Sequence, residues 1–508
     1  MSEVKKIKLS REEIAKREIG VTEVSKAQKL FLSIFFLLVI VVYPCVQFVY
    51  SSPLKEIRPA ATAQKAFKQY ETAIEDTSLL RAVLLTPAQE FLTKCFRTGN
   101  EKVIVGRDGW LFYSGDYDYL VNPGFLQAGR MHKRDLAGAH PDPVEAIKKF
   151  ADDLKKRDIR LILIPVPGKP LVYGDKLGAS DKLGNNKSFD GFKKQLDALG
   201  VTVLDFTDDF IAMRKNGVES FLKTDTHWTP EAMQFAAKKT AEAIGDGEAD
   251  NEEGARATIT ARGDIANMLK LPDVDDIFPK QTVEVVQYDI VQDRTSDVLL
   301  LGDSFTNIFS LDVMGWGTRA GFAETLAHEL GRPIDVIARN DAGAHATRDV
   351  LSTEFLRGRD RLEGKKVVVW EFAIRELAVG DWTDSPLELK ERGESGFLVI
   401  EEPKTVTATV LEVTSVPRPN SAPYKDHVMS LHLGDIDGSA EALVYIASMR
   451  DNVWTDAARL RIGDSVKIEL KPWADFEDEY GSWNRSEFED GDLILQEPCW
   501  GELMNNKQ

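Results

Sequence analysis

The feature that most restricts the fold of this chain is a regular alternation of short apolar segments with amphipathic segments, which starts near residue 140. The apolar segments predict β-strands at 160–165, 201–206, 298–301, 334–338 and 366–371. The segments between them predict helices at 143–156, 189–199, 230–244, near 319–330 and near 347–357. Continuous apolar strands that alternate with helices are typical of a parallel sheet covered on both faces. The sequence therefore predicts an α/β sandwich with a mostly parallel sheet.

Two stretches depart from this alternation, in a chain of 508 residues whose length favours more than one domain. Residues 246–296 contain an acidic patch and several prolines, and we expect them to form an insertion. After a polar linker at 384–396, period-two alternation predicts strands at 405–413, 428–433, 442–447 and 465–470. We therefore expect a separate all-β domain at 397–508, either a barrel of the OB type or a sandwich. Its segment 475–492 combines eight acids with four aromatic residues, which fits a solvated edge, a sugar-stacking surface or a cation site.

The N-terminal 100 residues predict a membrane anchor. Residues 1–29 are polar and carry eight basic side chains, and residues 30–50 are apolar over roughly the length that a bilayer requires. A cleavable signal peptide would have a shorter apolar part, followed directly by a small-residue cleavage site. The basic flank predicts a retained single-pass anchor in the inner membrane, with the N-terminus in the cytoplasm and the rest of the chain in the periplasm. Residues 51–100 have a helical composition and would form a stalk that leads away from the membrane.

Charge and composition narrow the classes of function. The chain carries 64 basic and 82 acidic side chains, a net charge of −18, and this acidic balance argues against a nucleic-acid partner. Seven histidines and three cysteines, with no Cys-x-x-Cys pair, provide little material for a zinc or iron–sulfur site, so we expect no metal and no cofactor. Cys95 and Cys499 either form a disulfide in an oxidising compartment or remain unpaired thiols.

Ser304 is the candidate nucleophile, because it follows the apolar strand at 298–301 directly after Gly302 and Asp303. A serine at the turn from a parallel strand into a helix has its hydroxyl at the carboxyl edge of the sheet, where backbone N–H groups and the helix dipole stabilise an anion. Nucleophilic acyl chemistry requires this geometry. A second Gly-Asp-Ser, at 463–465, lies between two alternating segments and is most simply a hairpin turn.

A serine nucleophile needs a histidine base, and that base usually needs a carboxylate that holds its tautomer. His227 has the best setting, because Asp225 lies two residues before it and both side chains face the same way in an extended segment. The alternative is that Asp225 caps the chain locally and His227 packs in a loop. His345, after the strand at 334–338, is a rival base without an adjacent acid, and His328 lies on a helix face.

Several motifs occur in a set order between residues 100 and 380. Gly-Asp-Ser-Phe follows a strand and is preceded by Asp-x-His-Trp; the other pieces are Gly-Arg-Asp-Gly-Trp-Leu-Phe at 106–112, Pro-Val-Pro-Gly-Lys at 165–169, Gly-Asp at 263–264, and Val-Trp-Glu-Phe at 369–372 with Arg375. This set resembles the SGNH hydrolase-like domain of the alginate O-acetyltransferases AlgJ and AlgX. Ordinary GDSL esterases have their Asp-x-x-His pair after the serine. Here the pair precedes the serine with two-residue spacing, as it does in that family.

The resemblance implies an SGNH-like domain at 101–383 that transfers acetyl groups to hydroxyls of an exported polysaccharide. It also implies a multi-pass membrane acyltransferase of the MBOAT class as the acetyl donor. Ser304 would carry the acetyl group as an ester, His227 would act as base and then as acid, and Asp225 would orient the imidazole.

Further residues take roles from the same resemblance. The backbone N–H of Ser304 and the side chain of Asn340 would bind the oxyanion, with a turn-forming role as an equal alternative for Asn340. Arg375 and Tyr113 are candidates for the sugar site, although ordinary packing and ion pairing are the favoured interpretation. Trp228 would either stack on a sugar ring or form a wall of the pocket.

Two other functions stay open at this point. A carbohydrate esterase would use the same triad to remove acetyl groups with water as the acceptor, and no sequence feature separates transfer from hydrolysis. A non-catalytic assembly protein would use the anchor and the β domain to recruit polysaccharide machinery. The connection to an MBOAT donor favours transfer.

Overall fold

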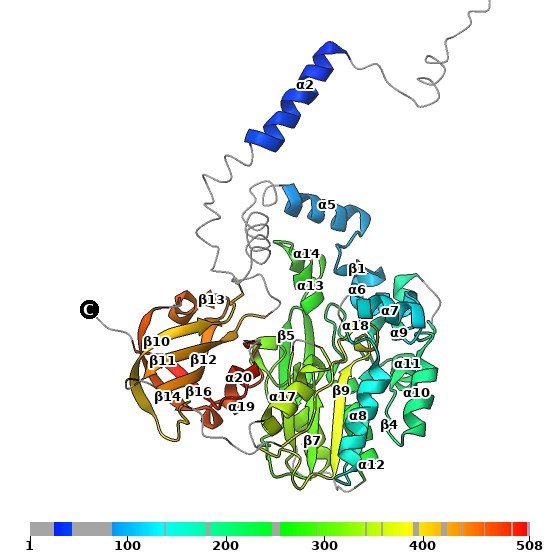
Figure 1. Ribbon diagram of the computed structural model, residues 1–508. Coiled ribbons are helices and arrows are strands. Elements are labelled where there is room, and N and C mark those ends of the chain that lie inside the picture. Colours follow the sequence, from blue (N-terminus) through cyan, green and yellow to red (C-terminus); the bar gives the residue numbers. More distant parts are fainter. Residues whose placement is uncertain are drawn as a thin grey trace, which may run out of the picture. The chain divides into compact units, whose positions relative to one another are not determined.

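Figure 1 presents the computed structural model of the chain. The described residues are 25–42, 84–136, 139–178, 183–245, 254–290, 292–340, 343–356, 359–389, 396–417, 424–436, 438, 440–461, 463–488 and 491–504. The chain forms two compact units, residues 1–91 and residues 92–508.

The first unit contains helix α2 (Lys26–Leu37), which continues as a short π-helix at Leu38–Val42. Ser25 and Gln28 form a capping box at its start, in which each side chain accepts a hydrogen bond from the other residue's backbone N–H. The expected anchor at 30–50 is described only as far as Val42, and residues 1–24 and 51–83 lie outside the described residues. In the part of the chain that the structure describes, no helix combines the length and the apolar character needed to cross a membrane. Helix α5 (Thr86–Phe96) belongs to the expected stalk.

A five-stranded parallel sheet forms the centre of the α/β domain, as the alternating pattern predicts. Its strands are β3 (Arg160–Val166), β4 (Thr202–Val203), β7 (Val298–Gly302), β8 (Asp335–Ala338) and β9 (Val367–Ala373). They lie in the order β4-β3-β9-β7-β8, and every pair is parallel. Both β7 and β9 are buried along their whole length, because each has a strand on both sides and helices over both faces.

Helices cover the two faces of this sheet (Figure 1). They are α8 (Pro143–Lys155), α10 (Phe189–Ala198), α12 (Pro230–Ile244), α16 (Phe322–Glu329) and α17 (Ala346–Leu356). Right-handed crossovers from β3 to β4 and from β8 to β9 put α10 and α17 on one face, where α8 contacts α10. The crossovers that run the other way put α12 and α16 on the opposite face, where these two helices pack together.

Two predicted elements of the α/β domain differ from the structure. The strand predicted at 201–206 is reduced to the two residues of β4, which pair only with β3 at the edge of the sheet. The helix predicted near 319–330 begins at Phe322, because Arg319 has a left-handed backbone (φ 57°) that cannot continue a helix. A period-3.6 pattern does not reveal such a local backbone conformation.

The expected insertion packs against the core of the α/β domain, and its acidic patch at 246–253 lies outside the described residues. It contains the antiparallel hairpin of β5 (Ala255–Ala261) and β6 (Gln281–Gln287), with the short helices α13 (Asp264–Met268) and α14 (Val274–Ile277) between them. The two helices pack through Ile265, Leu269 and Phe278 against the hairpin of β1 (Val103–Val105) and β2 (Leu111–Tyr113). This contact carries the start of α13 towards the carboxyl edge of the sheet.

The remaining helices of the α/β domain are short. They are α6 (Ser114–Val121), α7 (Ala128–Leu136), α9 (Lys169–Val172), α11 (Thr207–Lys215), α15 (Ser304–Asn307) and α18 (Glu376–Val379). Of these, α9, α15 and α18 follow β3, β7 and β9 directly. They therefore bring side chains to the carboxyl edge, where parallel α/β sheets bind their ligands.

The C-terminal domain is a closed β-barrel, which settles the choice between barrel and sandwich. Its strands are β10 (Lys404–Val413), β11 (His427–Ile436), β12 (Ala440–Arg450), β13 (Val453–Trp454), β14 (Ser465–Pro472), β15 (Arg485–Ser486) and β16 (Pro498–Leu503). The ring closes in the order β12-β16-β14-β10-β11 and back to β12. Short helices α19 (Glu477–Tyr480) and α20 (Gly491–Ile494) lie between β14 and β16. In the expected linker, residues 390–395 lie outside the described residues.

The structure decides two further expectations, one about the Gly-Asp-Ser at 463–465 and one about a disulfide between Cys95 and Cys499. The Gly-Asp-Ser at 463–465 does not join two strands of a hairpin, because β14 pairs with β10 and β16 and not with the strand before it. Gly463 instead donates its N–H to Val410 at 2.8 Å in a connection from β13 to β14. Cys499 is a free thiol in the apolar interior and Cys95 is a free, exposed thiol, so the disulfide is absent.

Candidate active site

The candidate nucleophile, Ser304, lies in a sharp turn between β7 and α15. Asp303 caps α15 by accepting the N–H of Phe305 at 2.8 Å, which leaves Ser304 half-buried at the first position of the helix. Gly302 is required before the turn, because a Cβ atom there would lie 2.2 Å from Oγ1 of Thr306. The predicted strand–serine–helix arrangement is therefore present.

The candidate base, His227, lies in a tight loop and not in the extended segment that the sequence suggested. A β-bridge between Phe221 and Trp228 closes this loop, and Leu222 N–H donates to the carbonyl of His227 at 3.0 Å. Within the loop the N–H of His227 donates to Oδ1 of Asp225 at 3.1 Å. This local hydrogen bond, and not strand periodicity, turns the imidazole and the carboxylate towards each other.

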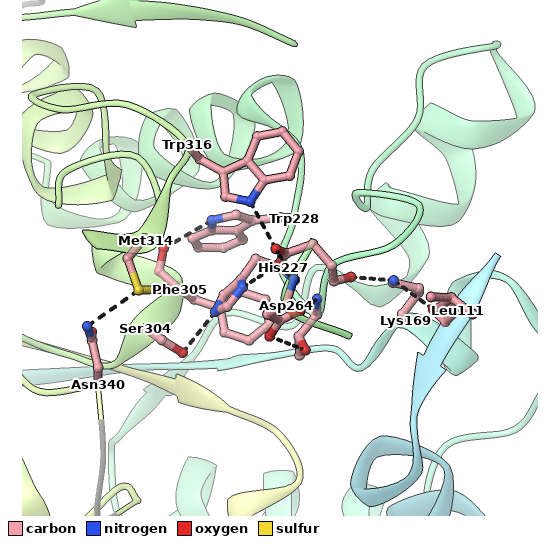
Figure 2. Close-up of polar contacts among 12 residues, drawn as sticks. Leu111, Lys169, His227, Trp228, Asp264, Ser304, Phe305, Met314, Trp316 and Asn340 are labelled. Atoms are coloured by element: carbon pink, nitrogen blue, oxygen red, sulfur yellow. Dashed lines mark hydrogen bonds and ion pairs between the residues drawn. The ribbon is translucent and has the colours of Figure 1, made fainter. Parts of the chain in front are cut away.

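His227 contacts both the hydroxyl of Ser304 and the carboxylate of Asp225, and Figure 2 shows the contact with Ser304. Its Nε2 lies 2.9 Å from Oγ of Ser304, and its Nδ1 lies 2.6 Å from Oδ1 of Asp225. His227 and Asp225 are buried, whereas Ser304 is half-buried. The three residues thus have the mutual contacts that a nucleophile, a base and an orienting acid need.

Two residues that sequence reasoning missed complete the hydrogen bonding of Asp225. Its second oxygen, Oδ2, accepts from Nε1 of Trp316 and from the backbone N–H of Asp264, each at 2.9 Å. Gly263 and Asp264 occurred among the ordered motifs without a role. Gly263 is needed because a Cβ atom there would lie 2.1 Å from the carbonyl oxygen of Thr224. No sequence pattern pointed to Trp316, which follows the nucleophile in a loop of irregular structure.

Asp264 also holds the loop between the acid and the base. Its two carboxylate oxygens accept from the N–H of Thr226 at 2.7 Å and from its hydroxyl at 2.8 Å. Burial, followed by the charge of Asp225, raises the pKa of Asp264 to about 6. Ligand atoms of Asp225, His227 and Asp264 lie within 4.8 Å of one another. Since these oxygens already accept hydrogen bonds from N–H and O–H groups, the cluster forms a hydrogen-bond network around the base.

A buried lysine supports the same loop from the other side. Nζ of Lys169 donates to the carbonyl of Leu111 at 2.9 Å and to the carbonyl of Asp225, and it lies 3.4 Å from the carbonyl of Lys223 (Figure 2). Burial lowers the pKa of Lys169 to about 8, against the opposing charges of Asp225 and Asp264. Lys169 closes the Pro-Val-Pro-Gly-Lys motif, so the sequence marked this residue but not its contacts.

The electrostatics favour an ion pair between the base and the acid. Burial alone would lower the pKa of His227, but the charge of Asp225 and the hydrogen bond to it raise the pKa above its ordinary value. Burial would raise the pKa of Asp225, but His227 and the donors at Oδ2 hold the pKa of that carboxyl well below its usual range. The site therefore stabilises the imidazolium that forms when a serine gives up its proton.

Trp228 does not present its ring to a ligand, so of its two expected roles the stacking on a sugar ring is wrong. The side chain is 0% exposed and packs against Phe305 and Phe322. Its Nε1 donates to the carbonyl of Phe305 at 3.1 Å. Trp228 therefore connects the loop that contains His227 to helix α15, which begins at Ser304.

Arg375 and Tyr113 lie together, as ordinary packing and ion pairing predict. Arg375 pairs with the buried Asp116 at 3.0 Å, and its guanidinium lies 5.3 Å from the centre of the Tyr113 ring. Burial would lower the pKa of Arg375, but Asp116, Glu376 and Asp303 raise it.

Asn340 lies beyond β8, near the nucleophile in Figure 2. Its Oδ1 accepts from Nδ2 of Asn307 at 2.7 Å, and its own Nδ2 donates to Sδ of Met314, a weak acceptor, at 3.5 Å. The rival bases have other contacts: His345 lies 3.8 Å from Asp349, one turn along α17, and His328 stacks on Tyr288.

Residues 103–374, more than half of the chain, match the family described as "SGNH hydrolase-like domain, acetyltransferase AlgX". Similar curated proteins include the probable alginate O-acetylase AlgJ of Pseudomonas fluorescens, 27% identical over 57% of this chain and 71% of its own length. The AlgJ of Azotobacter vinelandii is 23% identical over 56% of this chain and 71% of its own length.

Two solved structures resemble the chain. The O-acetyltransferase domain of Pseudomonas putida AlgJ covers 55% of this chain and 93% of its own, with 23% identity and a TM-score of 0.40. Pseudomonas aeruginosa AlgX covers 73% of this chain and 91% of its own, with 14% identity and a TM-score of 0.38. The family match spans the parallel sheet together with the serine, the histidine and the carboxylate described above. The chain therefore belongs to the AlgX family of SGNH hydrolase-like acetyltransferases and is an O-acetyltransferase.

Proposed function

We propose that this O-acetyltransferase transfers acetyl groups to hydroxyls of an exported polysaccharide through the triad Ser304, His227 and Asp225, with an acetyl-serine intermediate. The observation that carries the proposal is the unbroken contact from hydroxyl to imidazole to carboxylate, with distances of 2.9 and 2.6 Å. A polysaccharide acceptor is supported by the names of the related alginate O-acetylases.

The reaction has two half-reactions. Oγ of Ser304 attacks the acetyl carbonyl and gives its proton to Nε2 of His227, which passes the proton to the departing oxygen of the donor as the donor's C–O bond breaks. A sugar hydroxyl then attacks the acetyl carbon and gives its proton to His227. The serine oxygen leaves with that proton, and the product is an acetylated sugar and the free enzyme. Asp225 stays ionised and stabilises the imidazolium in both halves.

The oxyanion of each tetrahedral intermediate needs preorganised donors. The N–H of Ser304 belongs to the first turn of α15, where the helix itself offers no acceptor. Asn340 supplies the second donor in this proposal, since Asn307 occupies its carbonyl oxygen and so directs its NH2 group away from Asn307. A sulfur atom is a weak acceptor, so replacing this contact with a hydrogen bond to an oxyanion costs little free energy.

The proposal places the catalytic domain in the periplasm, anchored to the inner membrane by residues 30–50 and supplied with acetyl groups by an MBOAT-type membrane acyltransferase. Its support is the apolar segment at 30–50, which follows a polar segment that contains eight basic side chains. The exposed thiol of Cys95 provides a test in spheroplasts. A membrane-impermeant maleimide should label the wild-type chain but not Cys95→Ser, and labelling only after lysis would contradict this location.

The catalytic proposal is tested with the full chain, a labelled aryl acetate and unacetylated oligosaccharides that include alginate fragments. We expect label on the sugar, and in the absence of sugar an acetylated peptide that contains Ser304. Ser304→Ala should abolish both products. Ser448→Ala is the matched control, because Ser448 is a buried serine that also contacts a histidine.

The alternatives give different results in the same experiment. An esterase would release all of the label as free acetate even at high sugar concentration. A non-catalytic assembly protein would give no labelled Ser304 peptide, and Ser304→Ala would then support normal polymer acetylation in cells.

A further inference from the structure

Glu371 is a buried carboxyl group beside the nucleophile turn that the proposed reaction does not use. It lies in β9, next to β7, and its side chain is 1% exposed. Its Oε2 accepts the N–H of Asp303 at 3.1 Å and the hydroxyl of Thr306 at 2.8 Å. These two donors flank Ser304 in the sequence, so one carboxyl oxygen holds both sides of the turn.

The other oxygen of Glu371, Oε1, accepts no N–H or O–H group in the described part of the chain. Besides burial, the carboxyl group of Asp303 acts on Glu371 through its charge and through a side-chain hydrogen bond, and both raise the pKa of Glu371. Asp303 uses its own oxygens to accept the N–H of Phe305 and the N–H of Ala373, each at 2.8 Å. Two neighbouring carboxylates in a buried site cannot both be ionised without a large energetic cost.

The positive charge nearby does not neutralise Glu371. Arg375 and Glu376 act on Asp303, and Arg375 forms its ion pair with Asp116. Thr306, from α15, contributes a neutral hydroxyl. Among the described residues, Glu371 is therefore the member of the carboxyl pair without a compensating cation.

We propose that Glu371 is a positioning residue that carries a proton on Oε1 and, through this neutral carboxyl group, holds the turn that presents Ser304. The proposal rests on the proposed function of Ser304 as the nucleophile. In this state Oε2 is the carbonyl oxygen of the carboxyl group, and a carbonyl oxygen can accept the two hydrogen bonds that Oε2 receives. Burial and then the charge of Asp303 raise the pKa of Glu371 well above its ordinary value, in agreement with this assignment.

The neutral state has a consequence for catalysis. Ionised Glu371 would repel Asp303 and shift the turn, and with it the 2.9 Å contact between Ser304 and His227. Activity should therefore fall when Glu371 loses its proton at alkaline pH. A glutamine has the shape and hydrogen-bonding pattern of a protonated glutamate, but it cannot lose a proton in this range.

The test measures kcat and KM of the full chain for an aryl acetate across pH, with Glu371→Gln and Glu371→Leu as the matched pair. Glu371→Gln should keep the neutral-pH kcat close to that of wild type and should lack the alkaline decline. Glu371→Leu leaves both donors unpaired, and its kcat should fall about 100-fold with little change in KM. Circular dichroism confirms that each variant is folded.

The outcomes separate this inference from the proposed function. If Ser304→Ala keeps full turnover, the proposed function fails. If Ser304→Ala is inactive but Glu371→Gln loses as much activity as Glu371→Leu, the residue acts as an anion and the inference is overturned. A Glu371→Leu variant with wild-type kcat, or equal alkaline declines in wild type and Glu371→Gln, would overturn it as well.

A second measurement does not depend on activity. A carboxyl with a raised pKa keeps its proton in the folded state after the unfolded chain has lost it, so the stability that it contributes falls as pH rises above about 4.3. The folded-to-unfolded ratio of wild type, relative to that of Glu371→Gln, should fall about tenfold per pH unit from there up to the pKa of the folded state. Parallel stability curves for the two proteins would overturn the inference.

Discussion

The chain contains two buried histidines that each contact a serine hydroxyl, His227 in the α/β domain and His427 in the barrel. His227 has a serine on one ring nitrogen and Asp225 on the other. The ring nitrogens of His427 contact two serine hydroxyls, Oγ of Ser448 at 2.7 Å and Oγ of Ser486 at 3.1 Å. A histidine–serine contact alone is therefore poor evidence of a nucleophile.

The surroundings of the two serines explain the difference. Ser304 is half-buried at the start of a helix that follows a parallel strand, where backbone donors converge. Ser448 is 0% exposed within β12, where the strand's backbone groups are committed to the sheet. A donor can reach the half-buried hydroxyl of Ser304 but not the buried hydroxyl of Ser448, and the carboxylate of Asp225 stabilises the charged form of His227.

The largest effect is expected when the carboxylate that contacts His227 is replaced by an amide. Asp225→Asn should lower kcat about 10⁴-fold, because an amide neither stabilises the imidazolium nor holds the reactive tautomer. Turnover of an aryl acetate by the full chain measures the loss. The variant should retain the wild-type circular dichroism spectrum. A loss below about tenfold would show that the acid does not act on the base.

The second prediction concerns the pH at which His227 becomes protonated. His227 acts as a base only in its neutral form, and its pKa is raised by Asp225. The value of kcat/KM should therefore fall about tenfold per pH unit below an apparent pKa that lies above about 6.5. A pH–rate profile with an aryl acetate measures it. A profile that is flat across this range would mean that the imidazole does not take up the proton.

Lys169→Met tests the buried support of the loop that carries Asp225 and His227. The substitution leaves the carbonyls of Leu111 and Asp225 without their ammonium donor, so we expect a loss of about 2 kcal/mol in unfolding free energy. The kcat should fall about tenfold as the loop relaxes. Denaturant unfolding and aryl acetate turnover measure the two effects. Unchanged kcat in a destabilised protein would restrict Lys169 to a purely structural role.

The smallest effect is expected for the barrel histidine. His427→Ala removes a buried ring and its serine contacts, so we expect a loss of about 1–3 kcal/mol in stability and an unchanged kcat with an aryl acetate. His227→Ala is the matched control and should be inactive. Loss of turnover in a folded His427→Ala variant would contradict the contrast between the two sites.

Much of the catalytic arrangement was accessible from the sequence because its signals are local. A buried apolar strand followed by a serine marks the carboxyl edge of a parallel sheet, and an aspartate two residues before a histidine can reach it in an extended segment or, as here, in a tight loop. The predicted extended segment was wrong in form, since Asp225 and His227 meet in a tight loop, yet the pair was correct. For Trp228 the sequence left open a choice between stacking on a sugar ring and forming a wall of the pocket, because a local pattern does not reveal that a ring is completely buried.

The sequence by itself determined the parallel α/β pattern, the separate β domain, and the identity of the serine, the histidine and the carboxylate. Only the tertiary structure decided which groups complete them. Trp316 lies 91 residues from Asp225, and Glu371 lies 68 residues from Asp303. The strand order β9-β7-β8 and the packing of the insertion bring these segments together. Hydrophobic periodicity specifies which face of an element is buried, but not which distant element covers it, because that depends on packing over the whole chain.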